Sequence, residues 1–536
     1  MKKRYIISNI IWLLIIGIYY YFELPVINLQ AMEFWSFVIF ALIMFIAEMS
    51  IAYFGGKVIF SKSSRNRLAN FPKYILIPGI SIIVIIIGTL IINLICSPIF
   101  NADSYAHRIV IDETGDFTND IEEVDFNKLP LLDRTSSEKL GDRVMGQMSD
   151  YVSQYYVSDQ YTQINYNNDI IRVTPLEYAG FIKWFSNRKE GIKAYITVNS
   201  VNGEAKLVKL DKGMKYTPSG FFGDNLYRKL RFKYPTTIMG DARFEIDNEG
   251  TPYWIIPTYS YTGISLKTKV TGAIIFNPID GTSKKYDIED VPSWVDNAYN
   301  ASLIIEQVDD WGTYNGGFWN SIFGQKNVVN TTTGYNYLAI NDDIYLYTGI
   351  TSVLSDSSNL GFILSNMRTG KTTYYAVAGA EEYSAMASAK GQVQQMNYES
   401  TFPLLINLNN KPTYLVSLKD AAGLVKMYGF IDVEDYQKVT VTDASKGIVV
   451  AAQNYLSEYA EEITTGILEE KTITVEKISS ASIKGTTYYY IISNGQKYKV
   501  SIEVDDNLPF IKEKDILNIG YYKTEDKIIN IEKITY

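Results

Sequence analysis

The pattern of hydrophobic and polar positions divides the chain at about residue 100. Before that point lie three apolar runs, residues 5–22, 34–54 and 74–95, whose few polar residues form no stripe along one helical face. Each run is about 18–22 residues long, which is enough to cross the ~30 Å hydrocarbon core of a bilayer as a helix. The pattern therefore predicts a three-helix transmembrane anchor over residues 1–100.

Charge follows the same division and predicts an orientation. Residues 1–100 carry eight Lys or Arg and three acids, whereas the other 436 residues carry 42 Lys or Arg and 56 acids. The bases precede the first run or lie in residues 55–73, and the loop 23–33 has two acids and no base. The positive-inside rule then predicts a multi-pass plasma-membrane protein with a cytoplasmic N terminus and residues 101–536 outside. The alternative, a cleaved signal peptide over residues 1–22, lacks a small-residue cleavage site.

Two polar side chains fall inside the predicted spans. Glu48 lies six residues before the end of the second run, about 9 Å deep at 1.5 Å per residue, and Asn9 lies at a similar depth in the first. An acid at this depth is typical of a functional group such as part of a proton or ion path. The alternative is that Glu48 hydrogen-bonds Asn9 and fixes the packing of the three helices.

After residue 100 the pattern changes to short apolar segments separated by turn residues. Residues 101–192 read as an acidic stretch, a Pro-broken linker and an amphipathic helix near 137–156. From residue 193 to 465 the order strand, turn, strand and helix recurs, with helices expected near 292–307, 380–394 and 443–459. This recurrence predicts an α+β region of tandem sheet-plus-helix repeats, each burying one sheet face under its helix.

Two of these units share a short motif between strands. It reads Phe276-Asn277-Pro278-Ile279-Asp280-Gly281 in one unit and Ser365-Asn366-Met367-Arg368-Thr369-Gly370 in the next, and a third unit, from Pro412, lacks it. The motif resembles the core of PepSY-type modules, which are helix-plus-sheet units, often exported or membrane-anchored. That resemblance implies peptidase inhibition or an interaction role. The whole chain also resembles uncharacterised membrane-anchored exported proteins of Gram-positive-type bacteria, which implies no activity.

Residues 466–536 have a different pattern. Strand-like segments follow one another at residues 471–478, 486–493, 497–504, 516–522 and 528–534, and Asn494-Gly495 is a strong signal for a two-residue hairpin turn. This pattern predicts a small OB-like β-barrel at the C-terminal end. Residues 471–536 carry ten Lys and nine acids, so a basic groove for nucleic acid is not expected.

Composition excludes several kinds of chemistry. One Cys and one His exclude a disulfide framework, Cys-ligated zinc or iron–sulfur sites and multi-His metal sites. A net charge of −9 argues against generic nucleic-acid binding. Acids occur as adjacent pairs, which point in different directions on a helix or strand, so no catalytic pair can be assigned. We therefore expect no catalytic residue, no metal and no cofactor.

One segment is unusual for a plain scaffold. Residues 310–320 place Trp311, Tyr314, Phe318 and Trp319 among Gly and Asn residues. Aromatic side chains on a Gly-rich loop predict a surface on which a sugar or a peptide stacks. The alternative is a plug that covers the sheet, since large aromatic side chains are commonly buried.

Together these features predict a membrane-anchored extracytoplasmic protein with a non-catalytic binding or assembly role at the bacterial cell envelope. The expected partners are the lipid bilayer and an envelope protein or polymer. Nucleic acid is not expected, and the oligomeric state is open. Two alternatives remain: an envelope-acting hydrolase or peptidase-related enzyme that uses carboxylates, and a transport or signalling component that acts through Glu48.

Overall fold

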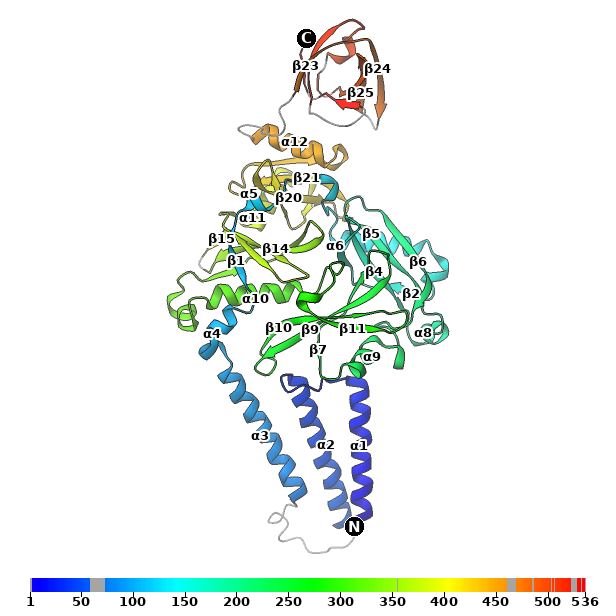
Figure 1. Cartoon of the computed structure of the whole chain (residues 1–536), viewed down its shortest axis with the longest axis vertical. Coiled ribbons are helices and arrows are strands. Elements are labelled where there is room, and N and C mark those ends of the chain that lie inside the picture. Colours follow the sequence, from blue (N-terminus) through cyan, green and yellow to red (C-terminus); the bar gives the residue numbers. More distant parts are fainter. Residues whose placement is uncertain are drawn as a thin grey trace. The chain divides into compact units, whose positions relative to one another are not determined.

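The chain forms two compact units, residues 1–458 and 459–536 (Figure 1). The computed structural model describes residues 2–57, 73–353, 355–459, 469–483, 486–502, 504–505, 507–521, 528–531 and 533–535. Three of the bases used to predict the orientation, Lys62, Arg65 and Arg67, lie outside the described residues.

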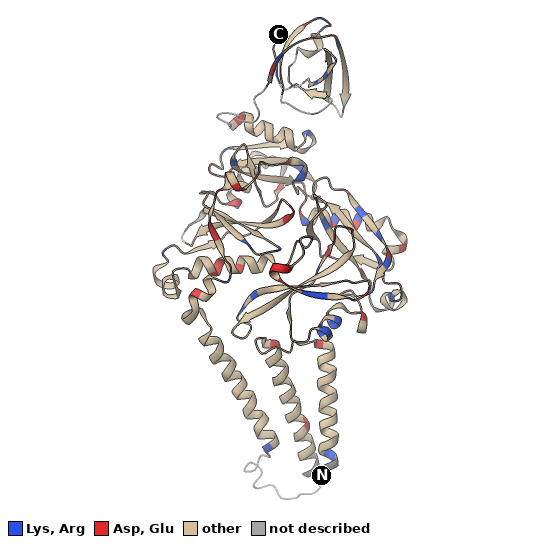
Figure 2. Cartoon of the chain, viewed as in Figure 1, with Lys and Arg blue, Asp and Glu red and all other residues tan. Residues whose placement is uncertain are grey.

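The first unit begins with three long apolar helices, α1 (Lys2–Glu23), α2 (Met32–Lys57) and α3 (Lys73–Ile95). Each is long and apolar enough to cross a membrane, which confirms the three predicted helices. Most side chains in these stretches are not buried by the protein itself, and charged residues are sparse along them (Figure 2). Helices of this kind are stable where hydrocarbon covers their surface.

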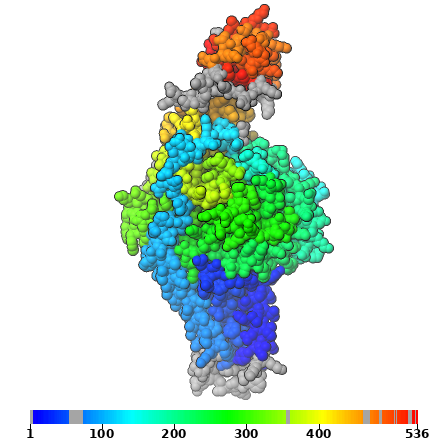
Figure 3. Space-filling view, in the orientation of Figure 1, coloured from blue at the N-terminus to red at the C-terminus, as the bar shows by residue number. Residues whose placement is uncertain are grey.

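The loop between α1 and α2 is bound to the folded region. Val26 is buried there, and the Ile27 N–H donates to the Pro235 carbonyl at 2.8 Å. Near the end of α3, the Asn93 side chain makes two hydrogen bonds with the backbone of Ile264, at 2.8 and 3.1 Å. The loop and the C-terminal end of α3 therefore both contact the folded region, and Figure 3 shows no gap between them and that region.

Residues 134–443 contain four antiparallel sheets that share one strand topology. In each sheet the first strand is split into two pieces, and both pieces pair with the long second strand. The third strand pairs with the other edge of the second, and the fourth pairs with the third. The first sheet consists of β2 (Tyr155–Val157), β3 (Thr162–Tyr166), β4 (Asp169–Tyr178), β5 (Ile192–Asn199) and β6 (Ala205–Met214). The second consists of β7 (Ile238–Met239), β8 (Arg243–Ile246), β9 (Pro252–Thr262), β10 (Lys267–Phe276) and β11 (Ser283–Asp287).

The third and fourth sheets repeat this order. The third consists of β12 (Val329–Thr331), β13 (Asn336–Ile340), β14 (Asp343–Ser352), β15 (Ser355–Asn366) and β16 (Thr372–Tyr375), with β1 (Ile111–Gly115) parallel to β16 and β17 (Gly379–Ala380) beside β15. The fourth consists of β18 (Glu399–Ser400), β19 (Leu404–Leu408), β20 (Lys411–Lys419), β21 (Val425–Asp432) and β22 (Val439–Asp443). A mostly β region with several sheets therefore follows the membrane helices, as expected.

Each sheet is covered by the helix that precedes it in the chain. These helices are α6 (Arg134–Gly146), α9 (Leu226–Lys233), α10 (Ala301–Tyr314) and α11 (Glu382–Gln392). In α10, for example, Ile304 and Val308 are buried against Leu346 and Ile363 of the third sheet. The predicted unit order placed each helix after its sheet. That order is wrong, because the buried face of the helix packs on the sheet that follows.

Two local helix predictions also differ from the structure. The helix expected at 137–156 is α6 and α7 (Ser149–Val152), followed by β2, and the supposed linker region 101–192 supplies β1 to β4. The helix expected at 292–307 begins only at Ala301, where the Asn300 side chain accepts the Ser302 N–H at 3.0 Å as an N-cap. Residues 296 and 297 are not helical because their N–H groups bond the Glu245 carboxylate instead.

The motif between third and fourth strands has one geometry in three sheets. The side chains of Asn199, Asn277 and Asn366 each accept the N–H two residues later at 2.8–3.0 Å. Four residues after each Asn, a Gly with φ between +73° and +78° donates its N–H to the Asn carbonyl at 2.8–3.0 Å. A positive φ favours Gly there. In the fourth sheet Asp432 makes the same side-chain turn, without the Gly.

The second unit has two sheets around one core. One sheet holds β23 (Glu469–Thr474), β27 (Ile516–Tyr521) and β29 (Lys533–Thr535), and the other holds β24 (Lys477–Ile483), β25 (Thr486–Ser493), β26 (Gln496–Ser501) and β28 (Ile528–Asn530). Asn494 and Gly495 form the predicted hairpin turn, with φ values of 49° and 76°. The predicted segments 471–478 and 528–534 each divide into two strands that belong to different sheets. The β-rich architecture is confirmed, and closure into a barrel stays a prediction.

Candidate functional site

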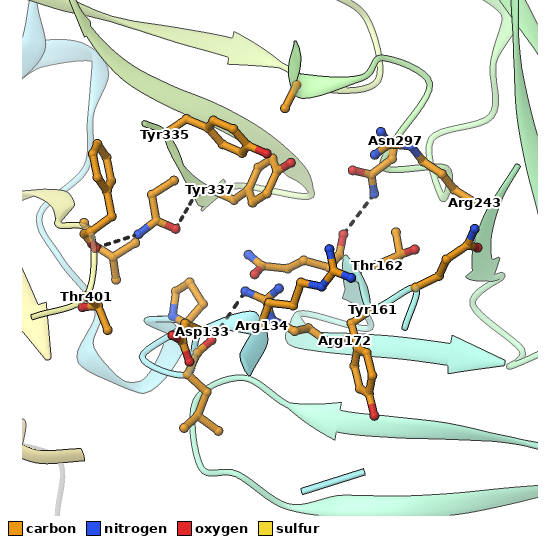
Figure 4. A pocket seen from close by; sticks show the side chains of 18 of the residues that line it. Asp133, Arg134, Tyr161, Thr162, Arg172, Arg243, Asn297, Tyr335, Tyr337 and Thr401 are labelled. Carbon is orange, nitrogen blue, oxygen red and sulfur yellow. Dashed lines mark hydrogen bonds between the residues drawn. The ribbon is translucent and has the colours of Figure 1, made fainter. Parts of the chain in front are cut away.

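A pocket of about 720 Å³ lies where the four sheets of the first unit meet (Figure 4). Its lining includes Thr162 from the first sheet, Arg243 from the second, Tyr337 from the third and Ser417 from the fourth. Residues 130–134, at the start of α6, also line the pocket. A concave site shared by four packed elements is a common place for ligand binding.

Arg172 is the most unusual group in the pocket. It lies on β4 between buried apolar residues and is 7% exposed. Its Nη2 donates to the Leu132 carbonyl at 3.5 Å, its Nε has no partner, and no carboxylate of the described residues forms an ion pair with it. Burial lowers the pKa of Arg172 to about 10. The nearby charges of Asp133 and Glu138 offset only part of this effect. A buried guanidinium without a paired carboxylate is costly to the fold, which is typical of a side chain kept for a ligand.

Three further residues give the pocket its character. Gln163 is 5% exposed, and neither its amide oxygen nor its amide nitrogen has a partner. Arg243 is half-buried and forms no ion pair with any described residue. Burial raises the pKa of Tyr337 to about 12, although the positive charges of Arg243 and Arg172 act in the opposite direction. The lining thus offers two unpaired guanidinium groups, an amide and a neutral phenol.

The other base of the lining has partners within the protein. The Arg134 Nε donates to Glu138 at 2.8 Å, and its Nη2 donates to the Asp159 carbonyl at 2.5 Å. Asp133, an acid of the lining, caps α6 and forms an ion pair with Lys419, which lies outside the lining. Arg172 therefore differs from Arg134 in having no carboxylate partner, although both line the same pocket.

A pair of buried carboxylates lies behind the pocket. Glu245 is fully buried and accepts the N–H groups of Asp296 and Asn297 at 2.9 and 3.0 Å. Asp296 is 1% exposed and accepts the Asn165 N–H at 2.8 Å. Burial raises the pKa of both acids, and the nearby charge of Glu245 raises the pKa of Asp296 further. Both carboxylates are closed to solvent and accept hydrogen bonds from backbone N–H groups. The pair therefore joins the first two sheets and does not form an open catalytic site.

The predicted aromatic loop is divided between a helix and a short π-helical turn. Trp311 and Tyr314 belong to α10, where Trp311 packs on Tyr374 at 6.2 Å between ring centroids and Tyr314 packs on Tyr105 at 5.8 Å. Phe318 precedes the turn η4 (Asn320–Gly324), and Trp319 is 63% exposed. The prediction of a Gly-rich loop is therefore wrong for Trp311 and Tyr314, because α10 continues through Tyr314.

Substitutions at the two Trp residues should have unequal effects. Trp311→Ala removes packing against the third sheet and is expected to lower the free energy of unfolding by about 1–3 kcal/mol. Trp319→Ala removes an exposed ring and should change it by no more than about 0.5 kcal/mol. Urea unfolding followed by Trp fluorescence measures both, and equal losses would contradict the assignment of Trp319 to the surface.

The intramembrane polar group makes a contact between two helices. The Ser8 Oγ donates to Glu48 Oε2 at 3.3 Å. The partner is thus Ser8, which is buried, and not Asn9, which is exposed, because neighbouring residues of α1 point in different directions. The predicted pairing with Asn9 is wrong, while the contact between α1 and α2 that it was meant to provide is present.

The pocket residues follow from no pattern in the sequence that predicts a site. One local signal was available, since Arg172 interrupts the otherwise apolar segment Ile170-Ile171-Arg172-Val173 of a strand with buried side chains on both faces. The other lining residues have no shared motif or spacing, because four different sheets bring them together. No protein-family model matches the chain, and no curated protein matches it.

Proposed function

We propose that this protein is a membrane-anchored extracytoplasmic binding protein of the bacterial cell envelope that holds an anionic group of an envelope polymer or protein in the pocket between its four sheets. The role is non-catalytic. The observation that carries the proposal is Arg172, a buried guanidinium in the pocket without a carboxylate partner. Arg243 and Gln163 supply further donors, and guanidinium groups are well suited to bind carboxylates and phosphates.

The fold supports an exterior location for this pocket. The loop between α1 and α2, which has acids and no base, contacts the folded region, whereas the basic N-terminal end lies at the opposite end of α1. Under the positive-inside rule the folded region is then extracytoplasmic. The four sheets are diverged PepSY-like repeats in this proposal, supported by their shared topology and the recurrent Asn–Gly turn. The second unit is an OB-like barrel in this proposal, supported by a chain that alternates between its two sheets.

The test compares Arg172→Met with Arg134→Met in the full chain, purified in nanodiscs. The probes are the anions glycerol 3-phosphate, glucuronate and N-acetyl-Ala-Ala, each titrated while the unfolding temperature is measured. At least one probe should raise the unfolding temperature of the parent chain in a saturable way, because a ligand that binds only the folded state stabilises it. Arg172→Met should abolish that shift, and Arg134→Met should keep most of it.

The same variants give a second readout without any ligand. Arg172→Met removes a buried charge that has no partner, so it should raise the free energy of unfolding by about 1–3 kcal/mol. A loss of stability in Arg172→Met would mean that the guanidinium serves the fold, and the proposed binding role would then be wrong.

A further inference from the structure

An exposed apolar cluster lies on the first unit beside the membrane helices. It consists of Phe181, Ile182 and Phe185 on the helix α8 (Phe181–Asn187), with Phe221 and Phe222 at the turn η2 (Phe222–Asp224). Their exposed fractions run from 37% for Phe221 to 75% for Ile182, although the Phe181 ring lies within 5.2–6.3 Å of the other three Phe rings. We call these five residues the aromatic patch. Contiguous exposed aromatic side chains of this kind mark a surface that binds something apolar.

The aromatic patch is connected directly to the end of the first membrane helix. The Arg228 Nη1 donates to the Phe222 carbonyl at 2.8 Å, and its Nε donates to the Tyr21 carbonyl at 3.0 Å. Its guanidinium also lies over the Tyr21 ring, 4.3 Å from the centroid. One side chain therefore spans from the patch to the last turn of α1. Figure 1 shows α9 at the side of the folded region from which α1 extends, next to the end of that helix.

The charge beside the patch is mainly positive, because Asp224, the one acid of η2, is paired with Arg188 at 3.2 Å. The helices α8 and α9 together contain five bases and no acid, namely Lys183, Arg228, Lys229, Arg231 and Lys233. In Figure 2 the ribbon of α9, next to the end of α1, is largely blue for Lys and Arg. Exposed Phe and Ile residues flanked by Lys and Arg are typical of segments that lie in the interface of a bilayer with anionic lipids.

We propose that the aromatic patch inserts into the lipid interface of the membrane that α1 to α3 cross. The occupant of this surface is lipid, because the patch adjoins the end of a spanning helix through Arg228. The inserted rings hold the folded region, and with it the pocket, against the bilayer surface. This inference rests on the membrane anchoring proposed above, and it assigns a lipid contact to residues outside the spans.

The test places an environment-sensitive fluorophore on the patch in the full chain. In a Cys96→Ala background, Ile182→Cys carries the probe, and Val449→Cys on α12 (Ile448–Tyr459) is the control, since Val449 is also an exposed aliphatic residue, at 50%. Both proteins are reconstituted in nanodiscs of phosphatidylcholine alone or with phosphatidylglycerol. Lipids that carry a spin label near the headgroup report contact by quenching, and iodide reports access from water.

Emission from position 182 should shift to shorter wavelength and be quenched by spin-labelled lipid, more strongly with phosphatidylglycerol, while position 449 should show neither effect. Phe185→Asp in the same chain should reduce the lipid quenching at position 182 without changing the far-UV circular dichroism, which reports that the fold is kept. Equal behaviour of positions 182 and 449 would overturn the proposal. Protection from iodide without lipid quenching would also overturn it, since another protein or a second copy would then cover the patch. A chain that does not enter nanodiscs would overturn the anchoring itself.

Discussion

The Asp296→Asn variant is expected to unfold at a higher urea concentration than the parent chain at pH 8, and at about the same concentration at pH 4.5. Asp296 and Glu245 are both buried, and burial raises the pKa of each carboxyl group above its ordinary value. The folded chain therefore holds protons that the unfolded chain releases near pH 4. The stability contributed by the protonated pair is fully present below the ordinary pKa and is lost as the pH rises through the raised pKa.

The size of this effect follows from proton linkage. Each proton that only the folded chain holds lowers the free energy of unfolding by up to ~1.4 kcal/mol for every pH unit of increase. A single such proton therefore lowers it by about 3 kcal/mol between pH 5 and pH 7. Asn at this position cannot ionise, while its side-chain oxygen can still accept the Asn165 N–H. The difference in the free energy of unfolding between variant and parent should therefore grow above pH 4.5 and level off once the pH has passed the raised pKa of Asp296.

The measurement is urea unfolding followed by Trp fluorescence at pH 4.5, 6, 7 and 8 in nanodiscs. All seven Trp residues lie within residues 1–458, so the signal reports the first unit alone. Asp211→Asn is the matched control, because Asp211 is exposed on β6 and should follow the parent at every pH. Parallel curves for Asp296→Asn and the parent would show that no proton is held by the buried pair.

The elements that the sequence predicts well are those with a local cause. Long apolar runs have no stable arrangement in water, so α1 to α3 follow from composition alone. The Asn277 and Asn366 turns follow from a side chain that bonds its own backbone and a Gly that permits positive φ. Such features need no knowledge of the rest of the chain.

The pocket and the buried acids depend on contacts that no local pattern encodes. Glu245 lies on the second sheet, and its hydrogen bonds keep residues 296 and 297 out of the helix that their pattern predicts. Arg172 and Tyr337 are 165 positions apart and meet only because the first and third sheets pack together. A sequence shows that Arg172 interrupts an apolar strand, but the missing counter-ion becomes visible only when every neighbour is placed.

Replacing Arg108 should destabilise the first unit more than the removal of an ion pair on the surface would. Arg108 is 8% exposed and lies just after α4 (Pro98–Ala106), where the chain leaves the third membrane helix. Its Nη1 forms ion pairs with Glu306 and Asp310 of α10, and its Nη2 donates to the Thr268 carbonyl at 2.6 Å. Lys267 shares both acids, at 2.8 and 3.1 Å.

Arg108→Met leaves two acids with one partly exposed base and leaves the Thr268 carbonyl without this donor. Removing one partner from a buried charge network costs about 3–5 kcal/mol, because the remaining charge stays in a poorly solvated place. Urea unfolding followed by Trp fluorescence should show a loss of this size. Lys206→Met is the control, since its pair with Glu204 is exposed and should be worth no more than about 1 kcal/mol.

A second substitution tests whether the loss of stability in Arg108→Met comes from an unpaired buried charge at Asp310. In the Arg108→Met chain, Asp310→Asn removes the buried charge that has lost its main partner, so the double variant should regain part of the stability that the single variant loses. If the single variant is as stable as Lys206→Met, the network does not hold α4 to α10. The opposite outcome is a double variant that is less stable than Arg108→Met by the full cost of a buried hydrogen bond. Neutralising Asp310 would then restore no stability. The loss in Arg108→Met would in that case come from packing and not from an unpaired charge.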